Sequence, residues 1–276
     1  QFGAGSTIEV ATLFPGAMFA NLTKANGGTA GGTTYDLTGF AVDTLTAGGA
    51  AATNTYNNLA NSAVIQVAGT AGGNLVTHQI GQQPELGIVT TSGGATLTSV
   101  SADGAVAFDT TLGDLTVKNL ITPGDTVYIT DGAALGANTL RIGQITDAGL
   151  TTVEASVSNG NLVLGSAATQ PAQAGLTVNG PVGSLTVFAS GAGDTINAQD
   201  SGSTITANGA GDRISVGIGA NTITANGAGD TITVGVTATG GAFATAQAIH
   251  ATGVGDTIAI ATKAADGSAI TWANTI

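Results

Sequence analysis

The sequence predicts an all-β protein whose carboxy-terminal part is a parallel β-solenoid, or β-roll, of 18-residue coils, with a β-rich amino-terminal part. The phrase TITANGAGD occurs at residues 204–212 and again at residues 222–230. Large aliphatic residues around it recur every nine positions, flanked by Thr, Ser and Asn and separated by Gly clusters, as in short strands joined by turns. The residues in this period are Val178, Val187, Ile196, Ile205, Ile214, Ile223 and Ile232.

The repeat also predicts how one coil is built. A nine-residue period does not fit a helix face, which needs apolar neighbours three, four and seven positions apart. In strands, side chains alternate between the two faces, so each Ile points inward while its Thr neighbours point outward. Eighteen residues then make one coil with two strands, and coils stack about 4.8 Å apart. One coil cannot bury its own Ile residues, so the coils must stack to be stable.

Stacking predicts two internal columns of Ile side chains. Ile196, Ile214 and Ile232 should form one column, and Ile205 and Ile223 the other. Burial of each Ile is worth roughly 1.5–3 kcal/mol. The period breaks near Gly240–Gly241 and resumes one residue out of phase at Ile249 and Ile258. We therefore expect a bulge or an inserted loop over residues 233–248.

The composition excludes several classes of protein. The chain has 276 residues, 5 Lys plus Arg against 17 Asp plus Glu, a formal charge of -12 and no Cys. So few cations exclude a nucleic-acid-binding protein and disfavour an anionic membrane surface. No apolar run is long enough for a membrane span. The start of the sequence lacks a basic signal-peptide region and its one Met is Met18, so we expect a processed chain or a piece of a longer one.

The segments Gly191–Asp194, Gly209–Asp212 and Gly227–Asp230 each read GAGD, and Asp256 ends a related GVGD that is out of phase. Spacing by 18 places the first three Asp residues on one edge, while the other edge carries Ser203 and Asn221. Carboxylates about 4.8 Å apart repel by roughly 3 kcal/mol per pair at an effective dielectric constant near 20.

Two interpretations of these turns remain open. The Asp residues are either exposed turn residues or ligands of calcium ions bound between coils, together with backbone carbonyls of the Gly-rich turns. The candidate metal-binding residues are Asp194, Asp212, Asp230, Asp256, Gly191, Gly209 and Gly227.

Residues 176–260 resemble the RTX (repeats-in-toxin) family, whose nonapeptide is G-G-x-G-x-D-x-U-x with U a large aliphatic residue. Asp194-Thr195-Ile196, Asp212-Arg213-Ile214 and Asp230-Thr231-Ile232 match its D-x-U part, whereas Ala210 and its equivalents stand where the fourth-position Gly belongs. The composition, and residues 36–69 in particular, are similar to surface-layer (S-layer) proteins of Gram-negative bacteria. These resemblances imply a secreted, calcium-ordered surface or lattice protein, exported in such families by a type I route.

For the rest of the chain, the sequence suggests parts at 1–84, 85–170 and 171–276, with the last boundary near Gln170–Pro171. Ile88, Leu97, Val106 and Leu115 are again nine apart, which indicates either a continuing solenoid or chance. Ala50–Ala63 is either a short helix or loop and strand. A second calcium cluster or, alternatively, solvated turns would account for a group of aspartates: Asp103, Asp109, Asp114, Asp125 and Asp131.

We do not expect an enzyme. His78 and His250 stand alone, HExxH and G-x-S-x-G motifs are absent, and Lys118 and Arg141 are ordinary single cations. The expected function is that of a secreted structural protein at the cell surface: an S-layer, sheath or filament subunit that self-assembles with calcium into a homo-oligomeric array.

Cell-surface polysaccharide is a further candidate partner. Alternatives are a fragment of a large RTX adhesin, or an ice-binding protein that uses the stacked pairs Thr204/Thr206 and Thr222/Thr224. The apolar residues Ile270, Trp272 and Ile276 either make intermolecular contacts or cap the roll.

Overall fold

The computed structural model describes residues 86–92, 94–122, 126–146, 149–199, 202–235 and 247–260, and the backbone of further short strands before residue 86 and at 241–242 and 270–271. Every regular element among these residues is a β-strand, and no helix occurs among them, as the sequence predicts. The chain divides into two compact units. The amino-terminal unit contains residues 1–130, 140–142 and 146–150, and the carboxy-terminal unit contains residues 131–139, 143–145 and 151–276. The division at 1–84, 85–170 and 171–276 stays a prediction.

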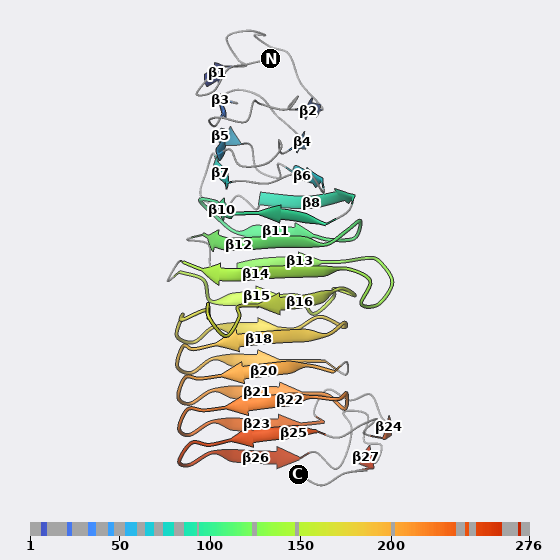
Figure 1. The fold of residues 1–276 in the computed structure, drawn as a ribbon, viewed down its shortest axis with the longest axis vertical. Coiled ribbons are helices and arrows are strands. Elements are labelled where there is room, and N and C mark those ends of the chain that lie inside the picture. The colour runs from blue at the N-terminus through green and yellow to red at the C-terminus, as the bar shows by residue number, and fades with distance from the viewer. Residues whose placement is uncertain are drawn as a thin grey trace. The chain divides into compact units, whose positions relative to one another are not determined.

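The amino-terminal unit consists of two parallel sheets, and the chain alternates between them except at β9 and β10, which belong to the same sheet (Figure 1). One sheet has the order β1 (Thr7–Glu9), β3 (Thr33–Asp36), β5 (Thr53–Leu59), β7 (Asn74–Gln79), β10 (Ser99–Ser101) and β12 (Leu115–Ile121), and β9 (Ala95–Leu97) also pairs with β12. The other has the order β2 (Asn21–Thr23), β4 (Thr44–Thr46), β6 (Val64–Ala68), β8 (Leu86–Ser92), β11 (Val106–Asp109) and β13 (Thr126–Thr130).

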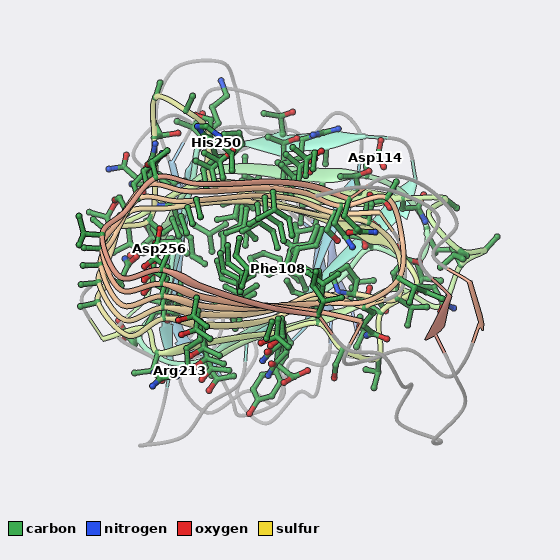
Figure 2. The ribbon with its side chains drawn as sticks, turned by 90° about the horizontal axis from the view of Figure 1, so that it is seen from below. Phe108, Asp114, Arg213, His250 and Asp256 are labelled. Carbon is green, nitrogen blue, oxygen red and sulfur yellow. The ribbon has the colours of Figure 1, made fainter. Side chains whose placement is uncertain are left out.

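This unit is a solenoid with a period longer than the sequence suggested. Val106 pairs with Leu86 of the preceding coil and with Val127 of the following coil, and both steps exceed the expected repeat. Ile88 pairs with Phe108, not with Val106, so the nine-residue spacing in this part of the chain is not the structural repeat. Phe108 is fully buried between the sheets (Figure 2). The prediction of a continuing solenoid is confirmed here, but the continued nine-residue period is wrong.

The helix alternative for Ala50–Ala63 is also wrong. Strand β5 occupies the middle of this segment. Its Thr and Tyr residues favour a strand and outweigh the neighbouring Ala residues.

The carboxy-terminal unit repeats the same two-sheet plan. One sheet has the order β15 (Thr152–Glu154), β17 (Thr177–Asn179), β19 (Thr195–Asn197), β21 (Arg213–Val216), β23 (Thr231–Val234) and β26 (Thr257–Ile260). The other has the order β16 (Asn161–Leu164), β18 (Leu185–Ala189), β20 (Thr204–Ala207), β22 (Thr222–Ala225) and β25 (Ala248–Ala251). β24 (Gly241–Ala242) pairs separately with β27 (Ile270–Thr271), and β14 (Thr139–Ile145) is divided between the units.

The predicted Ile columns are present in this unit. Ile196 pairs with Ile214, and Ile214 pairs with Ile232. On the other sheet, Ile205 pairs with Ile223. The partners in each pair are one predicted repeat apart and their side chains are buried, so the core contains the two predicted aliphatic columns, in which each coil covers the Ile of the next.

The interruption after Ile232 is an insertion that preserves the stacking. Ile223 pairs with Ile249 and Ile232 with Ile258, so both columns continue across a longer coil. The inserted loop starts later than predicted, because β23 continues to Val234.

Candidate functional site

The aspartate turns connect the two sheets of the carboxy-terminal unit at one side. They are the segments 190–194, 208–212, 226–230 and 252–256, and each leads into a strand of the β19–β26 sheet. Their Gly residues are shifted from the RTX pattern. In each turn one Gly lies directly before the Asp and one lies three positions before it, and the structure gives a separate physical reason for each.

The Gly directly before each Asp has a left-handed backbone. Its φ is +75° at Gly193, +76° at Gly211 and Gly229, and +86° at Gly255. Side chains disfavour this conformation, whereas Gly adopts it without steric cost.

The Gly three positions before each Asp lies against the neighbouring coil. A Cβ atom added at Gly209 would lie 1.6 Å from the carbonyl oxygen of Gly191, and one added at Gly227 would lie 1.6 Å from that of Gly209. Gly191, Gly209 and Gly227 therefore form a column with no room for side chains. Between the two Gly positions, Ala210 and its equivalents are exposed, which explains why that position tolerates a side chain.

The Asp residues that close these turns form a hydrogen-bonded column. The backbone N–H of Asp194 donates to Oδ1 of Asp212 (2.9 Å), and the N–H of Asp212 donates to Oδ1 of Asp230 (2.9 Å). The column begins where the N–H of Leu176 donates to Asp194 (2.9 Å), and it continues where the N–H of Asp230 donates to Asp256 (3.0 Å). Asp256 is out of phase in the sequence but joins the column in the structure, because the longer coil before it restores the register.

The column is buried, so the interpretation of these residues as exposed turn aspartates is wrong. Relative exposure is 1% at Asp194 and 0% at Asp212 and Asp230. In each of these three side chains the second oxygen, Oδ2, is buried and has no hydrogen-bond partner. A buried carboxylate oxygen without a partner is costly.

The electrostatics follow from this burial. Burial raises the pKa of Asp194 to about 6, against the opposing effect of the N–H of Leu176 and with a further increase from the charge of Asp212. The pKa of Asp212 is raised in the same way, by burial, while the N–H of Asp194 opposes the shift and the charge of Asp230 adds to it.

In the turn on the other side of the coil, at residues 217–221, a side-chain amide takes the place of the carboxylate. Oδ1 of Asn221 accepts the N–H of Ser203 from the preceding coil (3.0 Å), which is the same bond that the aspartates make. Nδ2 of Asn221 donates to the carbonyl oxygens of Gly217 (3.1 Å) and Gly219 (2.9 Å) and to Oε1 of Gln247 (2.9 Å). Both halves of this buried side chain are therefore satisfied. We call residues 217–221 the asparagine turn.

The aspartate column fits a calcium ion in one respect and not in another. The unpartnered Oδ2 atoms are hard oxygen ligands that a cation could neutralise. However, Oδ1 is already occupied by a backbone N–H, and the described residues contain no group of three or more His, Cys, Asp or Glu side chains able to hold a metal ion.

The aspartates of the second group, at residues 103–131, differ in exposure and in hydrogen bonding. Asp103 and Asp114 are exposed. Asp109 accepts the N–H of Thr111 (2.9 Å), and the buried Asp131 accepts the N–H of Ala133 (2.8 Å), so both stabilise turns. Asp125 lies outside the described residues.

Several other residues singled out in the sequence have no role that the described residues show. Lys118, Arg141 and His250 are exposed, and the side chain of His78, in β7, lies outside the described residues. Ile270 is in β27, and Trp272 and Ile276 lie outside the described residues.

The Thr pairs considered for ice binding do stack. Thr204 pairs with Thr222, and Thr206 pairs with Thr224. The flanking coils present Phe188 and His250 in the second of these columns, so the Thr array is two coils deep.

A second column of polar side chains was not anticipated from the sequence. Glu154, Asn179 and Asn197 end neighbouring strands and lie in register on the outer face of the sheet. Nδ2 of Asn197 donates to Oδ1 of Asn179 (2.9 Å), and Nδ2 of Asn179 donates to Oε2 of Glu154 (2.7 Å). The regular spacing of Asn179 and Asn197, each directly after a core aliphatic residue, is the signal that could have revealed it.

No protein-family model, curated protein or solved structure matches this chain. The part of the chain that the structure describes contains no helix long and apolar enough to cross a membrane.

Proposed function

We propose that this chain is a structural protein of a cell surface or extracellular layer, a subunit that associates with copies of itself into a lattice, sheath or filament. The observation that carries the proposal is the repetition in the carboxy-terminal unit, where core, turn and outer columns all serve to hold one coil on the next. The Ile columns fill the interior, and Gly191, Gly209 and Gly227 permit close contact between coils. Secretion is part of this proposal and rests on the RTX and S-layer resemblance.

The final described coil supports the assembly part of the proposal. Ile258 of β26 is 39% exposed, whereas Ile232, its neighbour in the same column, is fully buried. Among the described strands β26 ends its sheet, and an exposed apolar residue at such a place favours association with a further strand.

We also propose that calcium promotes this association. The support is the set of buried, unpartnered Oδ2 atoms of Asp194, Asp212 and Asp230, together with the net charge of -12. Calcium would neutralise carboxylates that otherwise repel one another between coils and between subunits.

Sedimentation velocity and electron microscopy of the full chain test both parts. We expect ordered sheets or filaments in millimolar calcium and smaller species in chelator, with magnesium as the control for general charge screening. Asp212→Asn should weaken the response to calcium, whereas Asp103→Asn, at an exposed position, should leave it unchanged. A chain that remains monomeric at high concentration with calcium would contradict the proposal, and assembly that is indifferent to chelator would contradict the calcium part alone.

A further inference from the structure

A groove bordered by Ser, Asn and Gln residues lies on the outer surface of the carboxy-terminal unit, beside the Glu154–Asn179–Asn197 column. It has a volume of about 310 Å³ and is open to solvent. Its lining residues are Ser156, Asn179, Gly180, Asn197, Ala198 and Gln199.

Hydrogen bonds fix the walls of the groove in place. Nε2 of Gln199 donates to the carbonyl oxygens of Ser156 (2.7 Å) and Gly180 (3.0 Å), so this side chain spans the turns of two preceding coils. Glu154 is held as well, because its Oε1 accepts the N–H of Ser156 (2.9 Å) and its Oε2 accepts the amide of Asn179. The side chains are therefore preorganised, which lowers the entropic cost of binding.

The groups left over in this arrangement are mainly acceptors. Both Asn179 and Asn197 use their amide nitrogens along the column, and Gln199 uses its amide nitrogen for the turns. The side chain of Ser156 is exposed, and a hydroxyl oxygen can accept a hydrogen bond. Among the described residues, Oδ1 of Asn197 and Oε1 of Gln199 receive no hydrogen bond. A matching ligand must supply several neutral donors, as hydroxyl groups do.

The outer face extends the same chemistry over further coils. Asn197 is in register with Ser215, and Ser215 with Thr233. These rungs repeat about every 4.8 Å. A polymer with repeated hydroxyl groups can contact several rungs at once, which compensates for weak individual contacts.

The geometry points to this groove as a binding site for a neutral, hydroxyl-rich polysaccharide. A polyanion is disfavoured by the carboxylate of Glu154 and by the net charge of -12. The inference deepens the proposed surface role by naming a ligand class and its site, and it does not depend on self-association.

Affinity electrophoresis of the full chain in chelator tests the inference. Gels contain a neutral glucan (dextran), an acidic polymer (polygalacturonate) or a cationic polymer (chitosan). We expect retardation by dextran. Ser156→Leu fills the groove and keeps the backbone groups that bind Glu154 and Gln199, and Gln199→Ala removes a wall, so both should weaken binding at least about tenfold. Ala210→Leu, at an exposed turn on the opposite side of the coil, is the matched control and should bind as the unmodified chain does.

The outcomes separate this inference from the proposed function. The inference that the groove binds a neutral polysaccharide is overturned by any of three results. These are no retardation by dextran, retardation only by chitosan or polygalacturonate, and equal binding by Ser156→Leu and Ala210→Leu. Thermal unfolding of each variant checks that the fold is retained. If dextran binds but no assembly forms with calcium, the proposed function fails alone; if assembly forms without dextran binding, the groove fails alone.

Discussion

The two turns of the regular coil perform one task with different chemistry. In both, a side-chain Oδ1 accepts a backbone N–H from the coil before: Asp212 from Asp194, and Asn221 from Ser203. The second atom differs. Nδ2 of Asn221 donates to two carbonyl oxygens and to Gln247, whereas Oδ2 of Asp212 is buried without a partner. In the asparagine turn both polar atoms of the side chain therefore have partners. In the aspartate turn, Oδ2 gains a partner only when a proton or a cation binds.

The largest expected effect comes from the close approach between aspartate turns. Gly209→Ala places a Cβ atom 1.6 Å from the carbonyl oxygen of Gly191, so neighbouring coils must separate. We expect a loss of about 4 kcal/mol or more in the free energy of unfolding, measured with urea. Gly202→Ala, where the nearest atom is the carbonyl oxygen of Ala220 at 2.8 Å, is the control on the other side of the coil and should cost less. Equal losses of unfolding free energy for Gly209→Ala and Gly202→Ala would contradict the view that the coils approach more closely at the aspartate turns.

The pH dependence of stability is the next effect in size. Burial raises the pKa of Asp194 to about 6, above the roughly 3.9 of an unfolded Asp, so the folded chain binds this proton more tightly. The resulting stabilisation is fully present below about pH 4 and is lost as the pH rises through about 6. The free energy of unfolding should fall by about 2–3 kcal/mol across this window.

Urea unfolding in chelator at pH 4 and pH 7 measures that fall. Asp212 contributes to the same fall, because burial raises its pKa as well. Glu154 differs, because hydrogen bonds from Ser156 and Asn179 outweigh burial and lower its pKa. The quantity to compare is therefore the difference between the unmodified chain and Asp194→Asn, which should be less sensitive to pH. An identical pH profile for both chains would exclude Asp194 as the source.

Replacing the amide of the asparagine turn with a carboxylate should have a smaller effect. Asn221→Asp keeps Oδ1 but replaces the donating amide with an oxygen that faces the carbonyls of Gly217 and Gly219. We expect a loss of about 2 kcal/mol at pH 7, partly recovered at pH 4 where the carboxyl is protonated and can donate. Thermal unfolding at both values of pH is sufficient, and a loss that is the same at both would show that charge is not the cause.

The reverse exchange should have the smallest effect and the opposite sign. Asp212→Asn removes a buried charge and keeps the acceptor for the N–H of Asp194. In chelator at pH 7 we expect a gain of about 1 kcal/mol. Measurement with calcium sharpens the comparison, because a bound ion would stabilise the unmodified chain and reverse the ranking of the two proteins. Destabilisation of Asp212→Asn in chelator would contradict the view that the buried carboxylate, with its unpartnered Oδ2, lowers the stability of the chain.

The sequence predicted the features that depend on spacing alone. The Ile columns and the stacked aspartates follow from the 18-residue repeat, because identical side chains recur at that interval. It could not predict the burial of Asp212, since spacing does not tell whether a turn side chain points to solvent or reaches back to the previous coil.

Other features were hidden because no regular interval marks them. The steps from Leu86 to Val106 and from Val106 to Val127 differ in length and in side chains, so no phrase repeats. The sequence places Asn221 at the equivalent position of the other edge, but the hydrogen bond that it shares with Asp212 was missed because the two residues differ in charge, although their side chains have nearly the same shape. The groove depends on Gln199 reaching the backbone of Ser156, a contact between distant parts of the sequence that no local pattern encodes.

The aspartate column also has a direction along the chain. Each carboxylate accepts the N–H of the turn that was made before it: Asp212 serves Asp194, and Asp256 serves Asp230. During synthesis from the amino terminus, the amide of a turn therefore waits in water until the next coil arrives with its acceptor. Each coil is completed by its successor, so the amide of Asp230 is satisfied only once the longer coil that leads to Asp256 has folded against it.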